Sequence, residues 1–122
     1  MQPRSIAPQR FHFQKFFPGG ASNFLQREKI NLPVDFPLEG LDITPFVRGG
    51  VPQGRAPPVY DCIAVSNHMG GMGGGHYTAY ARRGEGAAWF EFNDSSVRAL
   101  GDDPRAKIVS PDAYIVFYRL RE

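Results

Sequence analysis

Two stretches in the second half of the chain alternate between polar residues and apolar or aromatic ones, the pattern of half-buried β-strands. They cover 76–83 and 88–93, and the glycine-rich segment between them suits a tight connection. We predict a β-hairpin whose turn is centred on Gly84-Glu85. In that register His76 lies directly opposite Asn93.

The predicted hairpin has one apolar and one polar face, because successive strand residues point to opposite sides. We expect a core on the face of Tyr77, Ala79, Ala81, Ala88, Phe90 and Phe92. We expect a site on the face of His76, Thr78, Tyr80, Trp89, Glu91 and Asn93. Sliding the pairing by one residue would place Asp94 opposite His76, but would scatter the apolar set over both faces. The unslipped register is therefore preferred.

Other segments also have strand composition, bounded by glycine, proline and polar turns. They are 10–17 with a possible return strand at 25–32, then 60–66, 96–100 and 114–120. One helical turn capped by Asp42 is expected at 42–46. Residues 48–58 include three prolines and three glycines and are expected to form a surface loop or insertion. The chain should be mostly β.

An imidazole beside a side-chain amide is two thirds of a cysteine-protease triad. Opposed strand residues have Cβ atoms roughly 4.5 to 5.5 Å apart, so the Asn93 amide oxygen can accept a hydrogen bond from the His76 ring. That bond would fix the tautomer of the ring. A neutral amide suffices beside a thiol, because thiolate and imidazolium stabilise each other and only orientation is still required.

Four segments of the chain resemble, in order and spacing, segments of the ubiquitin-specific proteases. They are YDCIAVSNH at 60–68, GHYTAY at 75–80, WFEFNDSS at 89–96 and AYIVFY at 113–118. Arg10-Phe11 resembles the end of an earlier strand of that family. The resemblance covers nearly the whole chain from about Arg10, and it implies a thiol hydrolase that acts on ubiquitin and ubiquitinated proteins.

The resemblance also implies a fold and a set of site residues. In the family's papain-like arrangement a helical lobe carries the nucleophile and packs against a β-rich lobe that carries the histidine. We therefore expect the α+β class, with residues 1–122 as a partial, C-terminal and mostly β catalytic domain that lacks the helical lobe. The implied catalytic residues are His76 as general base, Asn93 as the third triad member and Asp94 as an assisting acid.

The glycine-rich loop before His76 has two interpretations. By resemblance it moves to admit the C-terminal tail of ubiquitin, with Gly74, Gly75 and Tyr77 lining the tail channel. Glycine allows both unusual φ angles and the close backbone approach that a thin diglycine tail needs. The alternative is a hairpin connection that binds nothing.

The nucleophile is not found in this chain. The only cysteine, Cys62, lies in a strand-like run where the family usually has an aliphatic core residue. Reactive cysteines sit in partly exposed, electropositive surroundings such as helix N-termini, and nothing around Cys62 promises one. We expect Cys62 to be buried and the chain alone to be inactive.

Composition excludes several other functions. A net charge of +2 without a block of like charge indicates no nucleic-acid surface, and the longest clean apolar run is too short to cross a membrane. One cysteine and no signal peptide favour a reducing compartment, the cytoplasm or nucleus. No cofactor is expected. The spacing of Asp61, Cys62, His68 and His76 matches no common metal motif, so no metal site is expected either.

Two alternatives to a deubiquitinase part remain open. The first is a non-catalytic ubiquitin-binding or regulatory module that kept the sheet and lost the helical lobe. The second is a truncated gene product. Activity on a ubiquitin–fluorophore substrate separates the enzyme from both.

Overall fold

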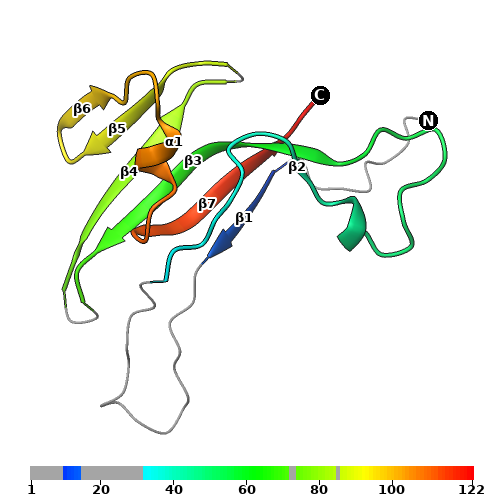
Figure 1. Cartoon of the computed structure of the whole chain (residues 1–122), viewed down its shortest axis with the longest axis horizontal. Coiled ribbons are helices and arrows are strands. Elements are labelled where there is room, and N and C mark those ends of the chain that lie inside the picture. Colours follow the sequence, from blue (N-terminus) through cyan, green and yellow to red (C-terminus); the bar gives the residue numbers. More distant parts are fainter. Residues whose placement is uncertain (1–9, 15–31, 72–73, 85) are drawn as a thin grey trace, which may run out of the picture.

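One antiparallel β-sheet organises the chain (Figure 1). The computed structural model describes residues 10–14, 32–71, 74–84 and 86–122. In these ranges the sheet order is β1-β7-β3-β4-β5-β6, with β2 paired to β3. The strands are β1 (Arg10–Gln14), β2 (Leu41–Asp42), β3 (Val59–Met69), β4 (His76–Arg82), β5 (Trp89–Asn93), β6 (Ser96–Ala99) and β7 (Ala113–Leu120). The helices described are a 3₁₀ turn, η1 (Thr44–Phe46), and the one-turn α1 (Arg105–Ile108).

The mostly β composition confirms the predicted fold class. Strands occur within each predicted range that the structure describes, whereas 25–31 and 15–17 lie outside the described residues. The predicted helical turn is η1, although its N-cap residue is Ile43 and not the predicted Asp42. The Asp42 Oδ1 atom accepts a hydrogen bond from the Thr44 N–H at 2.8 Å. Residues 48–58 contain no helix or strand. No helix within the described ranges is long and apolar enough to cross a membrane.

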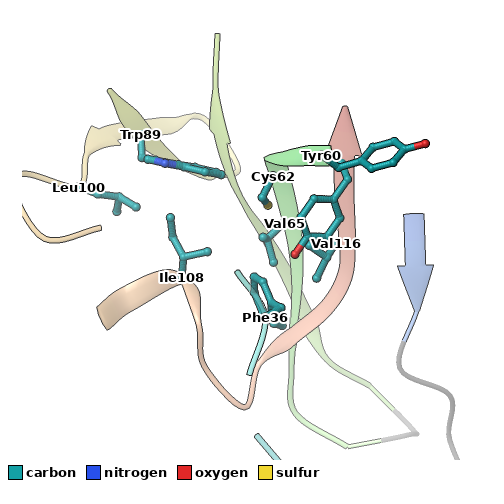
Figure 2. Close-up of a cluster of buried hydrophobic side chains, with 10 residues drawn as sticks. Phe36, Tyr60, Cys62, Val65, Trp89, Leu100, Ile108 and Val116 are labelled. Atoms are coloured by element: carbon teal, nitrogen blue, oxygen red, sulfur yellow. The ribbon is translucent and has the colours of Figure 1, made fainter. Parts of the chain in front are cut away.

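The core lies between one face of the sheet and two covering segments, 35–40 and 100–109. Figure 2 shows the side chains of Trp89, Leu100 and Ile108 pointing toward one another from β5, the residue after β6 and α1. The buried apolar residues are Phe36, Tyr60, Cys62, Val65, Trp89, Leu100, Ile108, Ala113, Val116 and Tyr118. Burying such side chains is the main favourable contribution to folding.

Hydrogen bonds from three strands hold the segment 35–40 on the sheet. Its Leu38 carbonyl accepts from the Cys62 N–H at 2.8 Å, and its Pro37 carbonyl accepts from the Tyr118 hydroxyl at 2.7 Å. Arg82 on β4 donates to the Leu38 carbonyl at 3.3 Å and to the Glu39 carboxylate at 3.1 Å. Buried polar groups are costly unless they are paired, and these bonds satisfy them.

Burial of the β4–β5 hairpin corrects one sequence prediction. The face expected to be a core is exposed, with Tyr77 at 58%, Phe90 at 39% and Phe92 at 41%. The opposite face is the covered one, and Arg82 and Trp89 are buried there. The hairpin has aromatic residues on both faces, so its own pattern does not reveal which face the segments 35–40 and 100–109 will cover.

The register of the hairpin is a second correction. Ala79 pairs with Phe92 and Arg82 with Trp89, a shift of two residues from the predicted pairing. The turn is closed by a hydrogen bond from the Ala87 N–H to the Gly84 carbonyl, and Gly86 takes the left-handed conformation with φ 67°. The turn is thus centred one residue later than predicted. A shift of two preserves the faces, because the side-chain period of a strand is two.

Asp61 generates a stability prediction. The residue is 6% exposed, and its carboxylate accepts hydrogen bonds from Arg121 at 2.6 and 2.9 Å and from the Gly40 N–H at 2.9 Å. The Arg121 bonds are the main reason that the pKa of Asp61 is lowered, despite the opposing effect of burial. A lowered folded-state pKa stabilises the fold above the unfolded value, and this contribution disappears as the pH falls through the folded value.

We therefore expect Asp61→Asn to lower the free energy of unfolding at pH 7 by about 1–3 kcal/mol, the cost of disrupting a buried charged hydrogen bond. The deficit should shrink as the pH falls below about 4, the ordinary value for Asp. Urea unfolding from pH 7 to pH 2 measures it, with the exposed Asp102→Asn as control. A deficit that does not change with pH would contradict this explanation.

Candidate active site

His76 and Asn93 meet at one end of the hairpin. His76 is the first residue of β4 and Asn93 the last residue of β5, and the His76 Nε2 atom lies 2.7 Å from the Asn93 Oδ1 atom. Continuing the observed register from Ala79–Phe92 makes the two residues diagonal neighbours. Diagonal neighbours are about 7–8 Å apart with their Cβ atoms somewhat closer, a gap that an imidazole and a carboxamide can span together. The predicted hydrogen bond is present, although the predicted direct opposition is wrong.

This bond selects the tautomer of His76. The side-chain oxygen of Asn93 is only an acceptor, so the ring nitrogen facing it carries the proton. In the neutral imidazole the lone pair is then on Nδ1. His76 is exposed, so Nδ1 can receive a proton from a group that approaches the edge of the sheet. This arrangement suits a general base held in one orientation.

Asp94 follows Asn93 but is not part of the hydrogen-bonded pair. It begins the two-residue turn between Asn93 and Ser96, which pair with each other, and has φ 50°. Among non-glycine residues, Asp and Asn tolerate this left-handed conformation best. The carboxylate is exposed and forms no hydrogen bond or ion pair with any residue in the described ranges. The observed contribution of Asp94 is therefore to the turn that ends β5.

The predicted tail-binding residues surround the start of β4. Gly74 and Gly75 are exposed, and Gly74 has open space where a Cβ atom would be. A Cβ atom on Gly75 would lie 2.3 Å from the His68 Nε2 atom and 2.7 Å from the Met69 carbonyl oxygen. Tyr77 points to the opposite face of the strand from His76. Close packing therefore requires glycine at position 75.

Thr78 is a neighbour of the pair whose role the sequence did not indicate. It lies on the same face as His76 and, in the observed register, opposite Asn93. It is buried, and its hydroxyl accepts a hydrogen bond from the Asn67 side chain at 3.2 Å. This bond links β3 to β4 directly beside the pair. This role becomes visible only once Asn67 on β3 is known to pair with Thr78 on β4. The residue pattern of the β4–β5 hairpin contains no information on that pairing.

Cys62 is far from this site. Met69 pairs with His76, and Cys62 lies seven positions earlier on β3, roughly 23 Å away at about 3.3 Å per residue. The thiol is fully buried, as predicted, and burial raises its pKa to about 12. Across the described ranges, no group of three His, Cys, Asp or Glu side chains is placed to hold a metal ion.

Comparison with known proteins identifies the family. The family model described as "Ubiquitin carboxyl-terminal hydrolase" matches residues 5–118. The chain belongs to this family. It is a ubiquitin-specific protease family member that covers part of the catalytic domain, and the family is one of deubiquitinases.

Curated relatives are much longer than this chain. Ubiquitin carboxyl-terminal hydrolase 15 of Rattus norvegicus is 44% identical over 96 residues, which are 79% of this chain and 10% of the relative. Ubiquitin carboxyl-terminal hydrolase 4 of Bos taurus is 42% identical over 111 residues, 91% of this chain and 10% of the relative. The chain thus spans about a tenth of these relatives.

Solved structures show the same architecture. The SAGA Ubp8/Sgf11/Sus1/Sgf73 DUB module matches with a TM-score of 0.75 and 27% identity, over 94% of this chain and 24% of that one. The same module bound to ubiquitin aldehyde matches with a TM-score of 0.74 and 26% identity, over 94% and 25% of the two chains. The sheet described above therefore corresponds to the β-rich lobe of the papain-like fold.

The buried thiol yields a prediction that requires no partner protein. A pKa of about 12 instead of 9.0 lowers the thiolate fraction at pH 8 on the order of a thousandfold. We expect Cys62 to react with iodoacetamide at a correspondingly reduced rate in the folded chain and at the normal rate in urea. Mass spectrometry after timed alkylation measures both rates. Rapid alkylation of the folded chain would contradict the inert assignment.

Proposed function

We propose that this chain is the C-terminal part of the catalytic domain of a thiol-dependent deubiquitinase, and that it supplies the general base and its orienting residue. The 2.7 Å contact between His76 and Asn93 is the observation that carries the proposal. Family membership supports the reaction class. The structural neighbour bound to ubiquitin aldehyde supports ubiquitin as the partner. The bond cleaved is the isopeptide bond after the terminal glycine of ubiquitin.

In the proposed mechanism another polypeptide segment supplies the nucleophilic cysteine. His76 Nδ1 takes the thiol proton, and the thiolate attacks the carbonyl carbon of the terminal glycine. The protonated ring then gives its proton to the departing lysine amine, leaving a thioester. A water molecule, deprotonated by His76, attacks the thioester and releases ubiquitin and the thiol. Throughout, Asn93 holds the ring by accepting the Nε2–H hydrogen bond.

The neutral amide fits this chemistry. A thiolate and an imidazolium form an ion pair that stabilises both, so the third residue needs only to fix the ring. We assign Asp94 an assisting role at the oxyanion region or on a water molecule. Because its carboxylate does not contact His76, removing it should cost less than removing Asn93.

The start of β4 is the proposed binding site for the C-terminal tail of ubiquitin. We propose that Gly74, Gly75 and Tyr77 line the channel for the diglycine tail of ubiquitin. They adjoin His76 in sequence, and all three are exposed. A channel built partly from backbone suits a substrate segment without side chains.

Turnover of a ubiquitin–fluorophore conjugate tests the proposal. The isolated chain should show no turnover above buffer, whereas a polypeptide that joins it to the cysteine-bearing helical lobe of a relative should be active. In that polypeptide His76→Ala should lower kcat by about 10²- to 10⁴-fold, the usual contribution of a general base. Asn93→Ala should lower it less, and Asp94→Asn less again. The 85% exposed Phe46 offers the control Phe46→Ala, which should have no effect.

Two outcomes would contradict the proposal in different ways. If the isolated chain hydrolyses the conjugate and Cys62→Ser abolishes turnover, the assignment of Cys62 is wrong. If the joined polypeptide is inactive while the isolated chain binds fluorescent ubiquitin saturably, the chain is a non-catalytic ubiquitin-binding module.

A further inference from the structure

His68 lies near both ends of the glycine-rich loop that connects β3 to β4. It is on β3 and pairs with Tyr77 on β4, one position before the pair of Met69 and His76. Its side chain is buried, and the residue is only 7% exposed. The imidazole ring lies 4.7 Å from the Tyr77 ring and 6.0 Å from the Tyr114 ring, measured between centroids. Neighbouring aromatic rings therefore hold the imidazole beside the two ends of the loop.

The backbone of Gly75 lies directly against this ring. A Cβ atom there would be 2.3 Å from the His68 Nε2 atom and 3.0 Å from its Cε1 atom, far inside van der Waals contact. Gly75 is not among the described glycines with positive φ, so lack of space, not backbone conformation, excludes a side chain. At the other end of the loop a Cβ atom on Gly70 would lie 3.0 Å from the Gly75 Cα atom. The two ends of the loop thus lie close to each other, and Gly75 also lies against the His68 ring.

The start of β4 has few other supports. β4 pairs with β5 only from Ala79 onward, so backbone pairs on that side do not reach His76. On the β3 side His76 is the last pair, and terminal pairs of a strand open most easily. A hydrogen bond weakens steeply with misalignment, so a small shift of His76 would break its bond to Asn93.

We propose that His68 is a positioning residue for His76. Its ring is the surface on which Gly75 lies, and this contact fixes the peptide that leads into β4 and hence the direction of the His76 side chain. The catalytic meaning of this role rests on the proposed function, but the positioning itself does not. It also explains Gly75 without reference to a ligand.

NMR of the 122-residue chain tests the proposal on the His76 ring. In the wild type we expect one tautomer, with Nε2 protonated and Nδ1 not, and a slowly exchanging Nε2–H proton. His68→Ala should accelerate the exchange of that proton about tenfold or more, the scale of losing one hydrogen bond, and should mix the tautomers. His68→Gln keeps a planar group that reaches the Nε2 position and should retain most of the protection. Phe90→Ala removes an exposed ring from the sheet face that carries Tyr77 and His68, and it is the matched control.

The outcome that contradicts the proposal is a His68→Ala chain with unchanged His76 behaviour. If His68→Ala leaves the His76 tautomer and exchange rate unchanged, the proposal is wrong, whether or not the amide spectrum of the sheet changes. Gly75→Ala gives a second test should His68→Ala not fold. The added methyl group must displace the His68 ring and also meets the Met69 carbonyl oxygen at 2.7 Å, so the part due to His68 is the amount by which the disturbance of the His76 ring is smaller in the His68→Ala background, where that chain folds. An undisturbed His76 ring in Gly75→Ala would overturn the proposal.

The two proposals fail separately. An active joined enzyme that tolerates His76→Ala would disprove the role of His76 as base, while the NMR result for His68 would stand. Conversely, an unchanged His76 ring in the His68 and Gly75 variants would leave the assignment of the base intact.

Discussion

The alignment of β4 between β3 and β5 is the constraint on which the site depends. β3 fixes His76 through its pair with Met69, and the turn at Gly84–Ala87 fixes the partners of β4 on β5. A shift of one residue would turn His76 to the opposite face of the sheet. A shift of two would keep the face but change the separation from Asn93. The observed alignment leaves the two side chains within hydrogen-bonding distance.

The sequence shows which residues share a face of the hairpin, but it does not show the centre of the turn or which face is buried. The period of two places His76 and Asn93 on one face in any register of the right parity. The observed register differs from the predicted one by two residues and still leaves them diagonal neighbours, so the predicted contact survives the error in register. The centre of the turn was not, because Gly84 and Gly86 both permit a tight turn and only the structure shows that Gly86 takes the left-handed position. The buried face was not predictable either. It is decided by segments 35–40 and 100–109, which lie outside the hairpin and have weak patterns of their own.

The role of His68 illustrates the same limit. As a lone histidine near the end of a strand, it gives no sequence signal for close packing. Its contact with Gly75 arises because β3 and β4 flank a loop whose ends meet, and the pairing of His68 with Tyr77 brings the ring to that point. Two glycines that looked alike in the sequence thereby differ in the structure. Gly75 lacks space for a side chain, whereas Gly74 has open space.

The chain presents an oriented imidazole, and its only cysteine is buried in the core. Cys62 lies in the core at the other end of β3, and its raised pKa keeps it protonated. The exposed position of His76 at the first residue of β4 is compatible with the proposed second lobe that would bring the nucleophile. The matched segment is only about a tenth of each curated relative to which the chain is similar. These relatives are therefore long enough to contain a second lobe.

The most direct measurement is to locate the adduct formed with ubiquitin that carries a thiol-reactive group at its C-terminus. The probe is offered to this chain joined to a cysteine-bearing helical lobe, and mass spectrometry identifies the modified residue. We expect the adduct on the cysteine of the added lobe, at a rate that falls sharply in the His76→Ala variant, and no adduct on the isolated chain. Modification of Cys62, or labelling of the added cysteine at a rate independent of His76, would contradict the account.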